Sequence, residues 1–149
     1  MEPEELVDRL DRLYCSHLMM AQWTIAVGSR HSVSSQLLLA GLHQEAQVHL
    51  DAAIQLAARI VELGGAITAD PSDVAYRAPI DSIELPDNPA DAPRALDQLY
   101  RLTMSAINAY QALLNTVGKS DPVSRHLVEA LLSAAADRSI VLVAAMGPE

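Results

Sequence analysis

The chain has 149 residues, of which 50% are hydrophobic, and a formal net charge of −9. This length suits one domain and this apolar content is enough for a core, whereas the acidic balance argues against a protein that binds nucleic-acid phosphates. The single cysteine, Cys15, excludes an intrachain disulfide, and no apolar run is long enough to span a membrane, so we expect a cytoplasmic protein without nucleic-acid or membrane partners.

The apolar residues are mainly Ala, Leu, Val and Ile, with no Phe, one Trp and four Tyr. Residues of this kind favour closely packed helices over an aromatic-rich β-sandwich. The composition therefore indicates an all-α fold, which we expect to form a single domain over residues 1–149.

The first predicted helix covers residues 3–27. Its core-facing positions recur every three or four residues, which places them on one face: Leu6, Leu10, Leu13, His17, Met20, Thr24 and Val27. Gly28 ends this helix, and a second helix with the same periodicity is predicted over residues 33–63. The short loop makes the two helices antiparallel neighbours, and Gly64 with Gly65 is a strong stop signal for the second.

A connector over residues 64–92 is rich in proline and acidic residues. Because proline lacks an amide donor and its ring clashes with the preceding turn, we expect no regular helix here: Pro71, Pro79, Pro86 and Pro89. About 25 extended residues can reach ~80 Å, whereas a helix of about 27 residues is only ~40 Å long. The connector can therefore cross a whole bundle, which predicts that the second and third helices run parallel.

The third helix is predicted over residues 93–117 and the fourth over residues 122–146. Asp121 before Pro122 is typical of a capping residue followed by a first-turn proline. The fourth helix is unusually apolar from Ile140 to Met146, so more than one of its faces should be covered. A partner subunit is one way to cover it.

Two helical hairpins joined by a long crossover form the ferritin-like four-helix bundle. The end of the second helix, Leu-Ala-Ala-Arg-Ile-Val-Glu-Leu-Gly-Gly from Leu56 to Gly65, is similar to the same helix end in bacterioferritins and in Dps (DNA-protection-in-starvation) proteins. Ala21-Gln22-Trp23 on the first helix resembles the Asn-Gln-Tyr of the first group and the Ala-His-Trp of the second. The chain thus resembles the ferritin-like superfamily over nearly its whole length. The resemblance implies a homodimer through the first two helices, or a larger hollow shell.

The resemblance also implies where metals would be expected. Ferritin-like iron oxidases bind two metals with one Glu each from the first and third helices and a Glu-x-x-His from each of the other two. This sequence contains no Glu-x-x-His. By the resemblance, the bacterioferritin ligand positions fall on six residues, of which only His49 is a possible ligand: Ser16, His49, Ala52, Thr103, Ala135 and Arg138.

Two further sites are tested by the same resemblance. The Dps ligands between subunits fall on Gln22, Ile54 and Ala58, and the haem-ligating methionine of bacterioferritin falls on Leu50. None of these residues suits the group it would have to bind. The standard di-iron ligands are therefore not retained, and we expect no cofactor and assign no catalytic residue.

Glu45 and His49 lie four residues apart on one face of the second helix. The simplest interpretation is a hydrogen-bonded pair within the helix. With His17 from the first helix they are also weak candidates for an iron or zinc site. This second interpretation has less support, because the spacing matches no known metal motif.

Arg138 interrupts an alanine-rich stretch of the fourth helix. The resemblance puts it at the level of residues on the other three helices, and a buried guanidinium must find an acceptor, for which Glu45 is the natural choice. We therefore predict a polar network that replaces the metals at the bundle centre: Ser16, Glu45, His49, Thr103 and Arg138. The alternative is that Arg138 points outward, where Asp137 or solvent satisfies it.

Three functions follow from these expectations. The first is a self-associating structural or binding module without a standard iron-oxidation centre, for which enzymatic activity stays open but is not favoured. The second is an iron-storage or Dps-type protein with a non-standard metal site. The third is a small-molecule-binding protein or enzyme that uses the emptied centre, where Ala52 and Ala135 leave room and His49 and Arg138 could hold an anion.

Overall fold

The computed structural model describes residues 1–29, 36–78 and 92–146. Within them lie four long helices, α1 (Pro3–Ser29), α2 (Gln36–Glu62), α4 (Ala92–Val117) and α5 (Pro122–Met146), and one short helix, α3 (Pro71–Arg77). No strand occurs in these ranges, which confirms the all-α prediction. The predicted start of the second helix at residue 33 lies outside the described residues. None of the described helices has the length and apolar character needed to cross a membrane.

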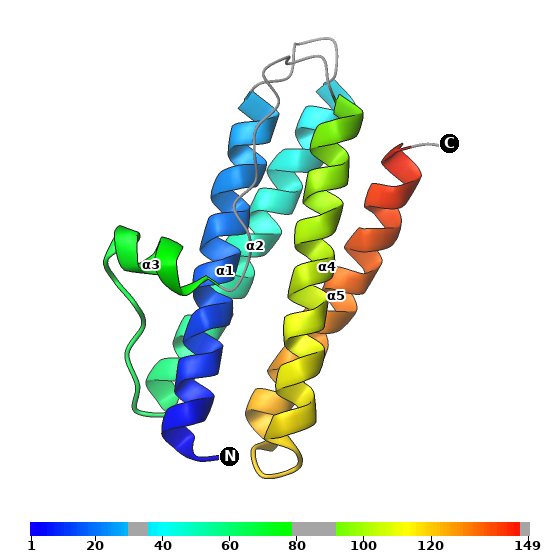
Figure 1. The fold of residues 1–149 in the computed structure, drawn as a ribbon. Coiled ribbons are helices and arrows are strands. Elements are labelled where there is room, and N and C mark those ends of the chain that lie inside the picture. Colours follow the sequence, from blue (N-terminus) through cyan, green and yellow to red (C-terminus); the bar gives the residue numbers. More distant parts are fainter. Residues whose placement is uncertain (30–35, 79–91, 147–149) are drawn as a thin grey trace.

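The long helices form a bundle of two hairpins (Figure 1). α1 packs mainly against α2, and α4 mainly against α5. The second partner of each hairpin runs back along the first, whereas α2 and α4 both start at the same end of the bundle and run in the same direction. This confirms the parallel arrangement that the length of the connector predicts.

The short helix α3 corrects one expectation, since the connector was predicted to contain no regular helix. Pro71 stands in the first turn of α3, where its missing amide costs no hydrogen bond. Asp70 caps the helix, because its Oδ1 accepts a hydrogen bond of 2.9 Å from the backbone N–H of Ser72. Proline is disfavoured in the interior of a helix, and the prediction wrongly applied this rule to the first turn as well.

Four residues fasten the connector and α3 to α1, and we call them the latch: Asp8, Asp11, Thr68 and Arg77. Asp11 accepts from the Thr68 backbone N–H at 2.8 Å, from the Thr68 hydroxyl at 2.6 Å and from Arg77 Nε at 2.9 Å. Arg77 Nη2 also donates to Asp8 Oδ1 at 2.6 Å. Asp11 is itself buried, so the latch supplies all the partners that a buried carboxylate needs.

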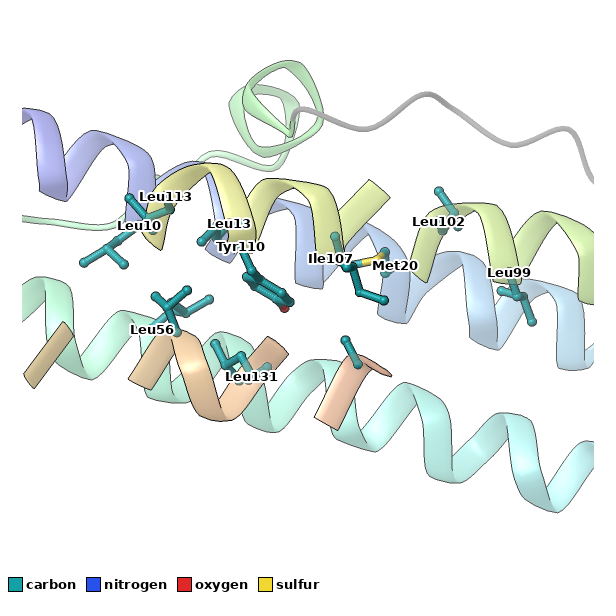
Figure 2. Close-up of a cluster of buried hydrophobic side chains, with 14 of the residues drawn as sticks. Leu10, Leu13, Met20, Leu56, Leu99, Leu102, Ile107, Tyr110, Leu113 and Leu131 are labelled. Atoms are coloured by element: carbon teal, nitrogen blue, oxygen red, sulfur yellow. The ribbon is translucent and has the colours of Figure 1, made fainter. Parts of the chain in front are cut away.

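The core runs along the whole bundle between the two hairpins (Figure 2). The predicted face of the first helix is buried from Leu6 to Thr24. The chain has no phenylalanine, and the largest fully buried side chain is Tyr110, which projects from α4 into the space between the helices. The core cluster is therefore aliphatic apart from Met20 and one phenol, whose hydroxyl must find a partner inside the protein.

Helix ends follow the sequence signals closely. Gly64 ends α2 in the left-handed region at φ +82°, which favours glycine. A Cβ atom at Gly65 would lie 2.6 Å from Val7 Cγ1, so α2 ends in direct contact with α1. The prediction that Asp121 caps the last helix is confirmed, because its Oδ1 accepts from the Ser124 backbone N–H at 3.1 Å.

Candidate functional site

Five side chains from all four long helices meet in a continuous polar line inside the bundle, and we call them the polar centre: His17 from α1, Glu45 and His49 from α2, Tyr110 from α4 and Arg138 from α5. The Tyr110 hydroxyl is hydrogen-bonded to His17 Nε2. His17 Nδ1 lies 3.1 Å from His49 Nδ1, and His49 Nε2 lies 3.2 Å from Glu45 Oε1. Arg138 Nε donates to the same Glu45 oxygen at 3.1 Å.

Helical spacing explains why these side chains meet. His17 lies one turn from Leu13 on the buried stripe of α1, and Tyr110 lies one turn from Ala106 on that of α4. Glu45 and His49 are four residues apart, so they share a face of α2. Each polar residue thus takes a register position that would otherwise hold an apolar one.

Burial changes along the line. The side chains of Glu45 and Arg138 are 12% and 14% exposed, whereas His49 and His17 are 2% and 1% exposed and Tyr110 is fully buried. The two charged residues therefore lie at the end closest to solvent. The tyrosine hydroxyl lies at the closed end, in the core.

The chemistry of the partners fixes where the hydrogens are. A carboxylate can only accept, so His49 Nε2 donates to Glu45. Burial above all holds the pKa of His17 well below its usual 6.5, so His17 is neutral and carries one ring hydrogen. If that hydrogen were on Nε2, it would point at the Tyr110 hydroxyl, whose own hydrogen would then have no acceptor among the described residues. His17 Nε2 therefore accepts from the Tyr110 hydroxyl, and His17 Nδ1–H donates to His49 Nδ1.

The line thus has one direction, with each donor pointing from Tyr110 toward Glu45. Burial raises the pKa of Tyr110, although Arg138 acts in the opposite direction, so the phenol keeps its proton and serves as a donor. The polar centre contains one ion pair and three neutral groups, and each member has a hydrogen-bond partner. A buried network that is satisfied in this way holds its helices in one arrangement.

Of the network predicted from the sequence, the structure brings Glu45, His49 and Arg138 together. It does not bring in Ser16 or Thr103. The Ser16 hydroxyl donates to the backbone oxygen of Arg12 at 3.0 Å, and the Thr103 hydroxyl donates to that of Leu99 at 3.0 Å. Short hydroxyl side chains on helices reach the carbonyl one turn back more easily than a neighbouring helix.

Sequence reasoning missed the role of Tyr110. The predicted network does not include Tyr110, and His17 is predicted only as a core-facing residue of the first helix and a weak metal ligand. A usable signal was present, because a tyrosine predicted to be buried needs a partner for its hydroxyl, and His17 is on the buried face of another helix. His43 and His126 are exposed and lie away from the polar centre.

The polar centre does not fit the pair of irons that ferritin-like oxidases hold. It contains one carboxylate, Glu45, and a permanent cation, Arg138, which opposes the binding of further cations. The two ring nitrogens of His49 face different partners, so His17, His49 and Glu45 lie along a line instead of around one point. Within residues 1–29, 36–78 and 92–146, no group of three or more His, Cys, Asp or Glu side chains is arranged to hold a metal ion.

The positions compared with the Dps ligands lie on the surface of the first hairpin. Gln22, Ile54 and Ala58 are all exposed, and Ile54 reaches 65% exposure. An exposed isoleucine on a helix face suits contact with another protein better than it suits a metal.

Comparison with solved structures identifies the fold. A variant of Dps1 from Mycobacterium smegmatis has a TM-score of 0.88 at 14% identity, covering 97% of this chain and 96% of that one. The Dps protein of Vibrio cholerae O1, described as a member of a superfamily of ferritin-like diiron-carboxylate proteins, has a TM-score of 0.87 at 15% identity, covering 95% of this chain and 89% of that one.

A third similar structure is a dodecameric thioferritin, the bacterioferritin-related protein of Bacteroides fragilis. It has a TM-score of 0.87 at 18% identity, covering 95% of this chain and 84% of that one. No family model and no curated protein matches the sequence. The chain therefore has the fold of the ferritin-like superfamily.

Proposed function

We propose that the chain is a Dps-type protein of the cytoplasm that assembles with copies of itself into a hollow oligomer and stores iron, using metal-binding groups outside the polar centre. The observation that carries this proposal is the structural agreement with Dps proteins over nearly the whole of both chains. The bacterioferritin-related protein is dodecameric, which supports the same type of assembly here. The net charge of −9 favours attraction of metal cations.

Exposed apolar side chains support self-association. On the first hairpin, Ile25 is 50% exposed and Ile54 and Val61 are each 65% exposed. On the last turns of α5, Ile140 and Val141 are 68% and 66% exposed. Apolar side chains gathered on two separate helix faces suit a subunit that has more than one neighbour.

The contacts of Glu45 bear on where iron could bind. Glu45 is already the partner of His49 and Arg138, so a metal in the polar centre would have to break those contacts. Exposed carboxylates remain as hard ligands for iron. We therefore place the iron-binding groups on the surface of the assembled subunits.

Light scattering after size exclusion, combined with metal analysis after aerobic loading with ferrous salt, tests this function. We expect a large assembly that retains iron through gel filtration. Glu45→Gln should retain the same amount of iron as the unmodified protein, because this residue takes no part in storage. A monomer without iron contradicts the proposal, and loss of iron in Glu45→Gln would move the site into the polar centre.

A matched pair of variants tests the assembly separately. Ile54→Glu places a charge on the apolar face of α2 and should reduce the assembled fraction. Gln55→Glu adds the same charge at the next residue, which is also exposed, and should assemble normally. Equal behaviour of the two variants contradicts an interface at Ile54.

A second candidate function is a self-associating structural or binding module that stores no metal. The observation in its favour is that the five residues of the polar centre satisfy one another and leave no carboxylate free there. The same loading experiment separates the two functions, since this module would form the assembly and retain no iron.

The third function, a small-molecule site in the emptied centre, has less support. Ala52 and Ala135 are both buried in the hydrophobic core cluster, so other side chains already cover them. His49 and Arg138, which could have held an anion, both contact Glu45 instead.

A further inference from the structure

The polar centre has a property that packing alone does not require. An unbroken line of proton donors and acceptors joins a fully buried phenol to a carboxylate close to the surface. We infer that Tyr110 is a redox-active tyrosine, which gives one electron to a strong one-electron oxidant while its hydroxyl proton moves to His17. This inference goes beyond the proposed function and needs neither assembly nor iron.

The surroundings of Tyr110 leave only a coupled route for its oxidation. Loss of an electron alone would leave a radical cation in an apolar interior, where an uncompensated charge is costly. Prior loss of the proton is also disfavoured, because burial raises the pKa of Tyr110. The electron and the proton must therefore leave together, and His17 Nε2 is the base in contact with the hydroxyl.

His17 passes the proton on. Burial holds its pKa well below the usual value, so an imidazolium at this position is unfavourable. As Nε2 gains the Tyr110 proton, Nδ1 gives its own to His49 Nδ1 at 3.1 Å, and His49 Nε2 gives its proton to Glu45 at 3.2 Å. Each proton therefore moves between two atoms that are already within hydrogen-bond distance, and the side chains do not have to rearrange.

The atoms and charges of this step balance. The Tyr110 O–H bond breaks, each imidazole gains a hydrogen on one nitrogen and loses one from the other, and a Glu45 O–H bond forms. The products are a neutral Tyr110 phenoxyl radical, two neutral histidines and a protonated Glu45, with one electron on the oxidant. No new charge is left on Tyr110, His17 or His49. The protonated Glu45 no longer balances Arg138, so the positive charge left by the electron lies on Arg138, at the end of the line closest to solvent, and reduction of the radical reverses each transfer.

The oxidant belongs to the class of high-potential one-electron acceptors, such as oxidised metal complexes or the radicals formed from peroxide. The chain offers internal comparisons, because it has three other tyrosines. Tyr76 on α3 is 91% exposed, and Tyr14 and Tyr100 are partly buried. Tyr110 alone among the four is hydrogen-bonded to a histidine within the described residues.

Electron paramagnetic resonance after rapid freezing tests the inference, with photogenerated tris(bipyridine)ruthenium(III) as the oxidant. We expect a tyrosyl radical in the unmodified protein that is lost in Tyr110→Phe and retained in Tyr14→Phe, Tyr76→Phe and Tyr100→Phe. An unchanged radical in folded Tyr110→Phe overturns the inference. A purely structural tyrosine would lower the stability of this variant without moving the radical signal.

The proton line is tested by a second set of variants. His49→Gln keeps a polar group but interrupts the line, so the yield of the radical should fall, whereas His43→Gln removes an exposed histidine of the same helix and should have no effect. Radical formation in the unmodified protein should also be slower in deuterated water. This measurement does not depend on the folding of any variant. Equal rates in the two solvents overturn the coupling of electron and proton.

Discussion

The polar centre and the latch both join helices through an arginine and carboxylates, but their surroundings differ. In the latch the Arg77 and Asp8 side chains are 28% and 44% exposed, so water still solvates the charges. In the polar centre Arg138 and Glu45 are 14% and 12% exposed, and hydrogen-bonded side chains continue the line into the core. The buried charge of the latch, Asp11, is 6% exposed and lies directly beside Arg77. In the polar centre the groups that continue inward, His49, His17 and Tyr110, are joined by hydrogen bonds and not by further ion pairs of arginine with carboxylate.

The largest expected effect concerns the ion pair of the polar centre. Glu45→Ala leaves Arg138 without its counter-ion and His49 without its acceptor, and should lower the free energy of unfolding by about 3 kcal/mol. Urea unfolding followed by circular dichroism measures this change. Glu129→Ala, which removes an exposed partner of Arg125 on α5, should cost less than about 1 kcal/mol.

A double-mutant cycle sharpens the same prediction. If Glu45 and Arg138 depend on each other, Arg138→Leu should cost much less in the Glu45→Ala background than in the unmodified protein. Stability that is unchanged by Arg138→Leu alone, or strictly additive effects, would mean that the contact contributes little to the fold.

A smaller effect is expected in the latch. Asp11→Asn keeps the shape of the side chain but removes the charge that Arg77 and Thr68 contact, and should cost about 2 kcal/mol. Asp8→Asn affects a more exposed carboxylate and should cost less than about 1 kcal/mol. Limited proteolysis should cut the connector faster in Asp11→Asn, and equal rates in both variants would contradict the latch.

The two regions should also lose stability in different pH ranges. The folded His17 resists protonation, so below its usual pKa of 6.5 the unfolded chain binds the extra proton and the free energy of unfolding falls. Asp8 acts in the same direction but at lower pH, since the hydrogen bond from Arg77 lowers its pKa below 3.8: the stability that it contributes is present above pH 3.8 and is lost as the pH falls below 3.8 and through the lower folded pKa.

Urea unfolding at a series of pH values measures both ranges. In His17→Gln the loss of stability that begins below about pH 6.5 should become smaller. His43→Gln, which removes an exposed histidine, should leave the curve unchanged. Identical curves for the two variants would show that the buried imidazole does not control this range.

The smallest effect is expected from the hydroxyl that was predicted to join the polar centre. Thr103 donates only to the backbone of its own helix, so Thr103→Val should change the free energy of unfolding by less than about 1 kcal/mol. Calorimetry of the two proteins decides this. A loss comparable to that of Glu45→Ala would place Thr103 in the network after all.

Sequence patterns predicted the long helices well, because stops such as Gly64 and caps such as Asp121 act locally and need no knowledge of neighbours. They failed at α3, where Pro71 is compatible with a helix because it stands in the first turn, after the cap Asp70. The resemblance put His49 and Arg138 at one level of the bundle, the need of a buried guanidinium for an acceptor pointed to Glu45, and Tyr110 was missed. The acceptor that a hydroxyl contacts depends on which of several nearby groups is free in the folded protein, and the spacing of residues along the sequence does not reveal this.

The close approach at Gly65 has a consequence for how this chain can vary. Any other residue would drive its first side-chain carbon into the side chain of Val7, so Val7 or the backbone at residue 65 would have to shift. In a library covering every substitution, position 65 should reject even alanine unless Val7 becomes smaller at the same time. Substitutions of Gly65 would then be tolerated only together with a smaller residue in place of Val7, and a survey of single substitutions would record position 65 as invariant.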